Sequence, residues 1–139
     1  MNWQSRYDAV AEAIAGLLGP EAEVVVHDLA TDTILRIVNP LSRRQAGDPS
    51  LLDLEPGDLA PGRSVLGPYE KAGPSGDRIR SVSAVLPGDD GRPAGLLCVN
   101  LGLGRVDAAA RLLAGLFPPP APRPEPLFRR DWREAINLI

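Results

Sequence analysis

The chain has 139 residues, of which 15 are Lys or Arg and 18 are Asp or Glu, so its formal net charge is −3. This length suits one domain, and the acidic balance argues against a phosphate-binding surface over the whole chain. One Cys and one His exclude an internal disulfide and a four-ligand zinc site, so we expect no metal. No apolar run reaches about 18 residues, and the start MNWQSRYDAV lacks the apolar core of a signal peptide. We therefore expect a cytoplasmic protein with no membrane span.

Helical and strand patterns alternate in the first part of the chain. Apolar residues at helical spacing predict an amphipathic helix over residues 3–18, which Gly19-Pro20 should end. Glu23–Asp28, with the sequence EVVVHD, predicts a short strand. After a turn at Thr31-Asp32, Ile34–Val38 predicts its hairpin partner.

Proline and glycine dominate the segment from Asn39 to Gly76, which favours loops over long regular elements. Ser50–Leu54 is a candidate for one helical turn, and Ser64–Tyr69 for a short strand. Loop-rich segments that a rigid sheet holds in place are common sites of ligand contact. An irregular surface connection is the alternative interpretation.

The strongest structural signal is a pair of apolar segments, Arg78–Leu86 and Ala94–Leu103, joined by PGDDGRP. Asp90-Gly91 should supply the positive φ angles of a tight reversal. The second segment is almost continuously apolar, as expected of a central strand that is buried on both faces. We expect the two to pair antiparallel, with Glu23–Asp28 beside the second.

The last third of the chain predicts two helices separated by a spacer. Apolar residues from Val106 to Phe117 recur at helical spacing. Six of the nine residues in 118–126 are proline, which predicts an extended linker. Residues 127–139 form an apolar helical seam that must pack on this domain, on a second subunit or on sequence outside the chain. The predicted organisation is a domain over residues 1–117, a linker over 118–126 and a C-terminal helix over 127–139.

Two side chains could in principle form a nucleophilic pair. A single strand histidine such as His27 is usually a hydrogen-bonded structural residue, and a ligand contact is the alternative. Cys98 lies in the most apolar strand and is expected to behave as a small hydrophobe. A Cys–His enzyme would need a thiol of lowered pKa, which nothing in the sequence indicates. Asp89-Asp90 is a turn pair, and no phosphate-binding glycine loop is present. We expect no catalytic residue and no cofactor.

Asn100 is more informative because it interrupts an apolar strand. A buried amide without partners costs roughly 1–3 kcal/mol. By the period of two, Cys98 and Asn100 share one strand face, while Leu97 and Val99 share the other. Asn100 therefore either binds backbone or points into a polar pocket.

Several short motifs follow one another in a recognisable order. They are VVVHDL (Val24–Leu29), the strand leading to Asn39, GDP (Gly47–Pro49), Tyr69, IRS (Ile79–Ser81), DDGRPAG (Asp89–Gly95) and LCVN (Leu97–Asn100). In this order they resemble YheO-like PAS domains, over about residues 5–117. The resemblance implies an α+β fold, a PAS-like five-stranded antiparallel sheet with flanking helices and a loop-rich flank that encloses a small cavity.

The resemblance also implies a function. In this family the domain senses a small molecule in a bacterial transcription regulator, and a C-terminal helix-turn-helix domain binds DNA. The expected ligand-binding residues are the family-matching polar ones on or beside core strands: His27, Asn39, Tyr69, Ser81 and Asn100. PAS domains commonly pair through flanking helices, so we expect a homodimer. A small enzyme using His27 and Cys98 and a ligand-free dimerisation module are the alternatives. The ligand's identity stays open.

DNA binding is expected only through a helix-turn-helix domain, and no such domain follows before Ile139. The basic residues are fewer than the acidic ones, and Lys71 is the only lysine, so the chain alone offers few phosphate contacts. The chain is either the sensor part of a longer regulator or a natural stand-alone domain.

Overall fold

The computed structural model describes residues 2–122. Contacts divide the chain after Asp107 into two units, each of which is described by itself. The end of the predicted linker, residues 123–126, and the predicted helix over 127–139 lie outside the described residues. None of the helices in the described part is long and apolar enough to cross a membrane.

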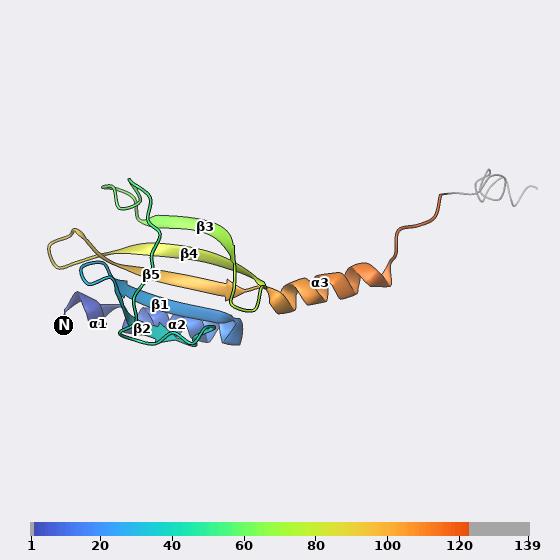
Figure 1. Ribbon diagram of the computed structural model, residues 1–139, viewed down its shortest axis with the longest axis horizontal. Helices are drawn as coiled ribbons and strands as arrows, with labels where there is room; N and C mark the ends of the chain where they lie inside the picture. Colours follow the sequence, from blue (N-terminus) through green and yellow to red (C-terminus); the bar gives the residue numbers. More distant parts are fainter. Residues whose placement is uncertain (1, 123–139) are drawn as a thin grey trace, which may run out of the picture. The chain divides into compact units, whose positions relative to one another are not determined.

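A five-stranded sheet in the order β2-β1-β5-β4-β3 forms the first unit, and every neighbouring pair is antiparallel (Figure 1). The strands are β1 (Ala22–Asp28), β2 (Thr33–Val38), β3 (Val65–Ala72), β4 (Arg78–Pro87) and β5 (Pro93–Gly102). The predicted α+β, PAS-like fold is confirmed. The predicted hairpin is β4–β5, and β1 lies on the other side of β5, as expected.

The helices are α1 (Trp3–Arg6), α2 (Asp8–Leu18) and α3 (Gly104–Leu116), with a 3₁₀ turn η1 at Gly19–Glu21. α2 ends at Gly19, whose φ is 79°, as predicted. The prediction of one unbroken helix over residues 3–18 was wrong, because Tyr7, at φ −99° and ψ 3°, separates α1 from α2. The separate α1 carries Trp3 over Gly95, where an added Cβ would lie 2.5 Å from the indole ring.

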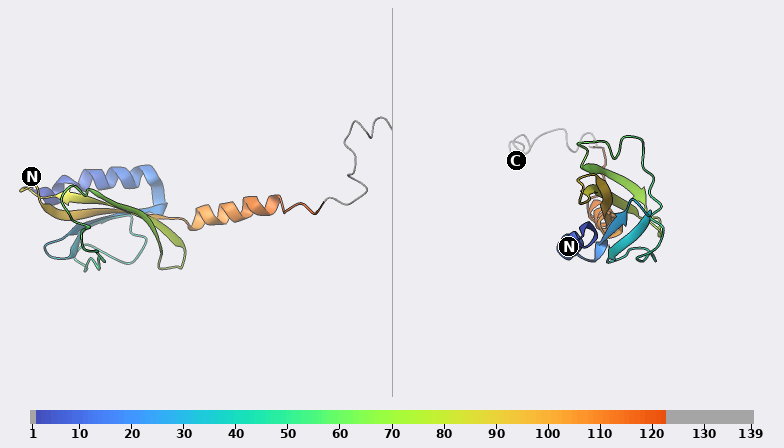
Figure 2. Two further views of the ribbon diagram at one scale, coloured as in Figure 1. Left: turned by 90° about the horizontal axis from the view of Figure 1, so that it is seen from above. Right: turned by 90° about the vertical axis from the view of Figure 1, so that its left-hand side faces the viewer.

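The sheet has a helix face and a cavity face, and strand alternation assigns each residue to one of them. The helix face packs against α2 through a cluster of Ala11, Ala15, Val24, Val26, Leu86 and Leu97. The cavity face carries a second cluster of Val25, Ile34, Leu66, Leu96 and Cys98, which the irregular segment between β2 and β3 covers. Figure 2 shows α2 along one side of the sheet and this segment on the other. Two separate cores therefore share one sheet.

Three local predictions need correction. Ser50–Leu54 is not helical: Ser50 donates its N–H to the carbonyl of Asp32, and Leu51 has φ 56°. The expected short strand at Ser64–Tyr69 is longer, because β3 continues beside β4 to Ala72. A positive φ was expected at both Asp90 and Gly91, but in the β4–β5 turn only Gly91 has one. The Asp90 carboxylate accepts the N–H of Arg92.

Candidate functional site

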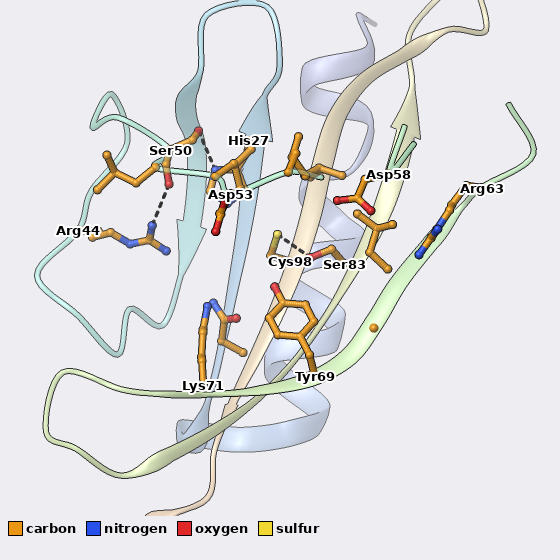
Figure 3. A pocket seen from close by; sticks show the side chains of 17 residues that line it. His27, Arg44, Ser50, Asp53, Asp58, Arg63, Tyr69, Lys71, Ser83 and Cys98 are labelled. Atoms are coloured by element: carbon orange, nitrogen blue, oxygen red, sulfur yellow. Dashed lines mark hydrogen bonds between the residues drawn. The ribbon is translucent and has the colours of Figure 1, made fainter. Parts of the chain in front are cut away.

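A cavity of about 500 Å³ lies between the cavity face and the irregular segment (Figure 3). β1, β3, β4 and β5 each contribute side chains to it, and residues 44–63 supply the remaining wall. Along β5 the lining residues are Leu96, Cys98 and Asn100, at every second position. Leu97 belongs to the cluster on the helix face, so the predicted common face of Cys98 and Asn100 is confirmed.

His27 is 2% exposed, and its Nδ1 lies 2.8 Å from Ser50 Oγ, with which it shares a hydrogen bond. Burial, and after it the positive charge of Arg44, lower the pKa of His27 from 6.5 to about 4. The imidazole is therefore neutral at neutral pH. It presents a buried, uncharged polar group to the cavity.

A buried polar network crosses the sheet beside the cavity. Ser81 Oγ donates to Asn100 Oδ1 at 2.7 Å, and Asn100 Nδ2 donates to Glu23 Oε1 at 2.9 Å. The backbone N–H of Leu41 donates to the other Glu23 oxygen at 2.7 Å, and Arg44 Nη2 lies 3.6 Å from Oε1. Glu23, Ser81 and Asn100 are all less than 5% exposed. Partners on the two neighbouring strands, β4 and β1, thus satisfy the Asn100 amide, which removes the expected cost of its burial.

Charged side chains of both signs line the cavity. Arg44, Arg63 and Lys71 are cationic, whereas Asp53 and Asp58 are acidic. Figure 3 shows Arg44 and Lys71 toward one side of the view and Asp58 and Arg63 toward the other. Asp58 accepts the N–H of Glu55 at 2.6 Å. The cavity is therefore polar at both ends and apolar where the leucines line it.

The structure brings four of the five predicted site residues together. His27, Tyr69 and Asn100 line the cavity, and Ser81 lies behind it, bonded to Asn100. Asn39 lies elsewhere: with φ 54°, it donates Nδ2 to the carbonyls of Pro20 and Ala22. Asparagine tolerates this left-handed conformation better than most residues. The two hydrogen bonds join the end of β2 to η1 and to the first residue of β1.

Sequence reasoning missed Glu23, Arg44 and Lys71. Glu23 could have been found, since it lies four positions before His27 on the same strand and so shares its face. Lys71 could have been found in the same way, because it lies two positions after Tyr69 on the same strand and so shares its face. Arg44 gives no such signal, because it lies in a segment without a regular period.

The site offers no activated nucleophile among the described residues. Burial raises the pKa of the Cys98 thiol, and Ser83 Oγ donates to its sulfur at 3.0 Å. A reactive cysteine needs the opposite shift. Residues 2–122 also contain no group of His, Cys, Asp and Glu side chains placed to hold a metal ion.

This arrangement of sheet, covering loop and lateral cavity is the one that the motif order implied. The sequence matches the YheO-like PAS domain family over residues 3–118. The chain belongs to this family. The chain is also 45% identical to the transcriptional regulator DauR of Pseudomonas aeruginosa, in a match that covers 96% of this chain and 64% of DauR. The chain thus spans less than two thirds of that relative's length. No solved structure matches it.

Proposed function

We propose that this PAS domain is the sensor part of a bacterial transcriptional regulator and that a small molecule binds in its cavity. The relative DauR is named as a transcriptional regulator, which supports the role in transcription. The observation that carries the sensing role is the cavity itself. Its volume of about 500 Å³ suits a small ligand, and small-molecule sites combine apolar walls with a few fixed polar groups.

An ion-pair relay supports a route from the cavity to α3. On β3, Tyr69 and Lys71 line the cavity, so Glu70 between them points to the other face. Glu70 accepts two hydrogen bonds from Arg78 Nη1, at 3.0 and 2.9 Å. Arg78 also donates from Nε and Nη2 to Asp107 in the first turn of α3, at 2.9 and 2.6 Å. These bonds, first those to Asp107, raise the pKa of Arg78.

A ligand that contacts Tyr69 or Lys71 would favour one position of β3 and, through Arg78, one arrangement of the start of α3. This mechanism is a population shift, which requires only that the ligand bind one arrangement more tightly. In the whole regulator, residues 118–126 would act as the linker and residues 127–139 as the helix that leads to a DNA-binding domain. DNA binding, in the cytoplasm, would belong to that domain.

Pairing of two copies is part of the proposal. In α3, Val106, Ala110 and Leu113 recur at helical spacing, a pattern that suits packing between helices. Light scattering should therefore show a dimer at micromolar concentration. A monomer under these conditions would contradict the pairing and leave the sensing role unaffected.

A thermal-shift screen of metabolites tests the sensing role. A ligand that binds the native state raises the melting temperature by mass action. The double variant His27→Ala/Asn100→Ala should lose this response relative to its own baseline. Arg6→Met, at an exposed ion pair with Asp89, should keep it. If no metabolite stabilises the protein, a ligand-free dimerisation module becomes the better interpretation.

The relay has its own test. Arg78→Gln should leave the ligand's affinity unchanged while the ligand no longer alters hydrogen exchange in the first turn of α3. A ligand-dependent change that persists in Arg78→Gln would exclude the relay.

A further inference from the structure

We infer that the ligand carries a carboxylate, which Arg44 and Lys71 bind at one end of the cavity. This inference rests on the proposed sensing role and specifies its chemistry. Arg44, Lys71 and Asn100 line the main cavity and also an adjacent hollow of about 390 Å³. The two cations therefore border the same space and lie beside a neutral amide.

The two cations at this end are only weakly paired. Glu23 is a nearby carboxylate, and it already accepts hydrogen bonds from Leu41 and Asn100. Arg44 reaches Glu23 only at 3.6 Å and the Ser50 carbonyl only at 3.5 Å. Charge-assisted hydrogen bonds are typically about 2.7–2.9 Å long, so the Arg44 guanidinium keeps donors available. Lys71 makes no ion pair with any described residue.

Arg44 and Lys71 therefore keep donors that the described residues do not use fully, and a single carboxylate between them would accept from both. The neutral imidazole of His27 adds no charge of its own at this end.

The rest of the cavity indicates what the carboxylate is attached to. Leu52, Leu54, Leu66 and Leu96 form apolar parts of the wall. A short aliphatic body would therefore remove apolar surface from water on both partners. Of the labelled charged residues, Asp58 and Arg63 lie toward the other end (Figure 3), so an additional ammonium group on the ligand would be tolerated there, beside Asp58. A simple carboxylic acid and an amino acid would thus both bind through their carboxylate. The titrations described next distinguish these two classes of ligand.

Four probes with one five-carbon skeleton test the inference on the whole 139-residue chain. They are pentanoate, pentanamide, pentylamine and 2-aminopentanoate, each titrated at millimolar concentration and neutral pH while ¹⁵N amide shifts are recorded. We expect pentanoate or 2-aminopentanoate to shift amides of the cavity residues in a saturable way, and the amide and amine not to do so. Whichever of the two acids binds more tightly identifies the source of the carboxylate. Added salt should weaken the binding, because the charges are partly exposed.

Variants locate the anionic head. Lys71→Met and Arg44→Met should each weaken the binding of the acid by roughly tenfold, the factor that about 1.4 kcal/mol of lost charge pairing produces. Arg63→Met removes a cation from the same cavity at the other end and should change the affinity by less than about twofold, in line with the weak effect of a solvated, more distant charge. Amide-shift maps also show whether each variant keeps the fold.

The failures can be told apart. If pentanamide or pentylamine binds as well as the acids, the carboxylate inference is wrong and the cavity is still a ligand site. If none of the four probes binds, the carboxylate inference is again overturned, whereas the metabolite screen decides separately whether the domain senses any molecule. If Arg63→Met weakens the acid as much as Lys71→Met does, the placement at the Arg44–Lys71 end is wrong.

Discussion

The helix face and the cavity face alternate residue by residue along β5, yet they are covered in different ways. On the helix face, α2 presents Ala11 and Ala15, and Ala11 is completely buried. Small residues let the helix lie close to the sheet, so that the space fills with apolar side chains. On the cavity face, an irregular segment with few regular contacts covers the strands and leaves a cavity.

The difference shows how one sheet can combine stability with binding. The buried cluster of the helix face is apolar, and the buried Asp28 at the end of β1 bonds to the turn that follows it. The cavity face, by contrast, buries Glu23, His27 and Asn100 in the middle of the sheet. Buried polar groups on the cavity face need hydrogen-bond partners, and neighbouring strands and the irregular segment provide them. We therefore expect the helix face to supply most of the apolar stabilisation and the cavity face to supply specificity.

The largest effect should come from comparing two adjacent residues of β5. Leu97→Ala removes a side chain that is 4% exposed on the helix face and should lower the free energy of unfolding by about 2–5 kcal/mol. Cys98→Ala, on the cavity face, removes one sulfur beside an existing cavity and should cost about 1 kcal/mol or less. Urea unfolding measures both. Equal losses would show that the two faces do not differ in packing.

The next effect tests the polar network of the cavity face. Asn100→Leu deprives the buried Glu23 carboxylate of a donor and the Ser81 hydroxyl of its acceptor. We expect a loss of about 1–3 kcal/mol in the free energy of unfolding. Because Glu23→Gln alters the same contact, the double variant should lose less than the sum of the two single losses. Additive losses would show that the two side chains are not coupled.

The sequence predicted correctly those features of the fold that depend on local patterns. The β4–β5 hairpin, β1, β2 and the shared face of Cys98 and Asn100 follow from the period of two and from a turn with glycine, which are local properties. The five-stranded antiparallel sheet was implied by the family resemblance. For Tyr7 the helical period gave no warning, because the apolar positions continue through the break.

Local sequence patterns could not predict the positions of residues that are held by contacts distant in the sequence. The N–H of Ser50 bonds to the carbonyl of Asp32, 18 residues earlier, so the segment around Ser50 could not be placed from its own propensities. Arg44 reaches the cavity through the course of an irregular segment, which no periodicity encodes. Asn39 was selected as a polar residue near a strand, but its positive φ and its two backbone bonds fix it at the end of β2.

A third prediction concerns pH and separates the faces by their charge. The pKa of His27 is about 4 in the folded protein against 6.5 in the unfolded chain. As the pH falls from about 6.5 toward 4, the unfolded chain binds a proton that the folded protein does not bind. Stability therefore falls over this range, and the contribution is fully present above pH 6.5. By pH 5 the loss should reach about 1–2 kcal/mol.

His27→Asn is the matched control, because it keeps a polar side chain without the titration. The difference in unfolding free energy between the two proteins should grow more favourable to the variant as the pH falls from 7 to 5. His27 is the only histidine, so its ring resonances in the untagged protein also report its pKa directly. A titration midpoint near 6.5 would mean that the site is wetter than its 2% exposure indicates.

The smallest effect should come from the surface of the helix face. Arg36 of β2 forms ion pairs with Glu12 and Asp8 of α2, and its side chain is 37% exposed. Such partly solvated pairs contribute little, so Arg36→Gln should change the free energy of unfolding by only about 0–1 kcal/mol. Ile14→Ala, which removes apolar contact between the same helix and the sheet, should cost more in the same urea experiment. If Arg36→Gln cost as much as Ile14→Ala, charge rather than close packing would hold α2 on the sheet, and the contrast between the two faces would lose its basis.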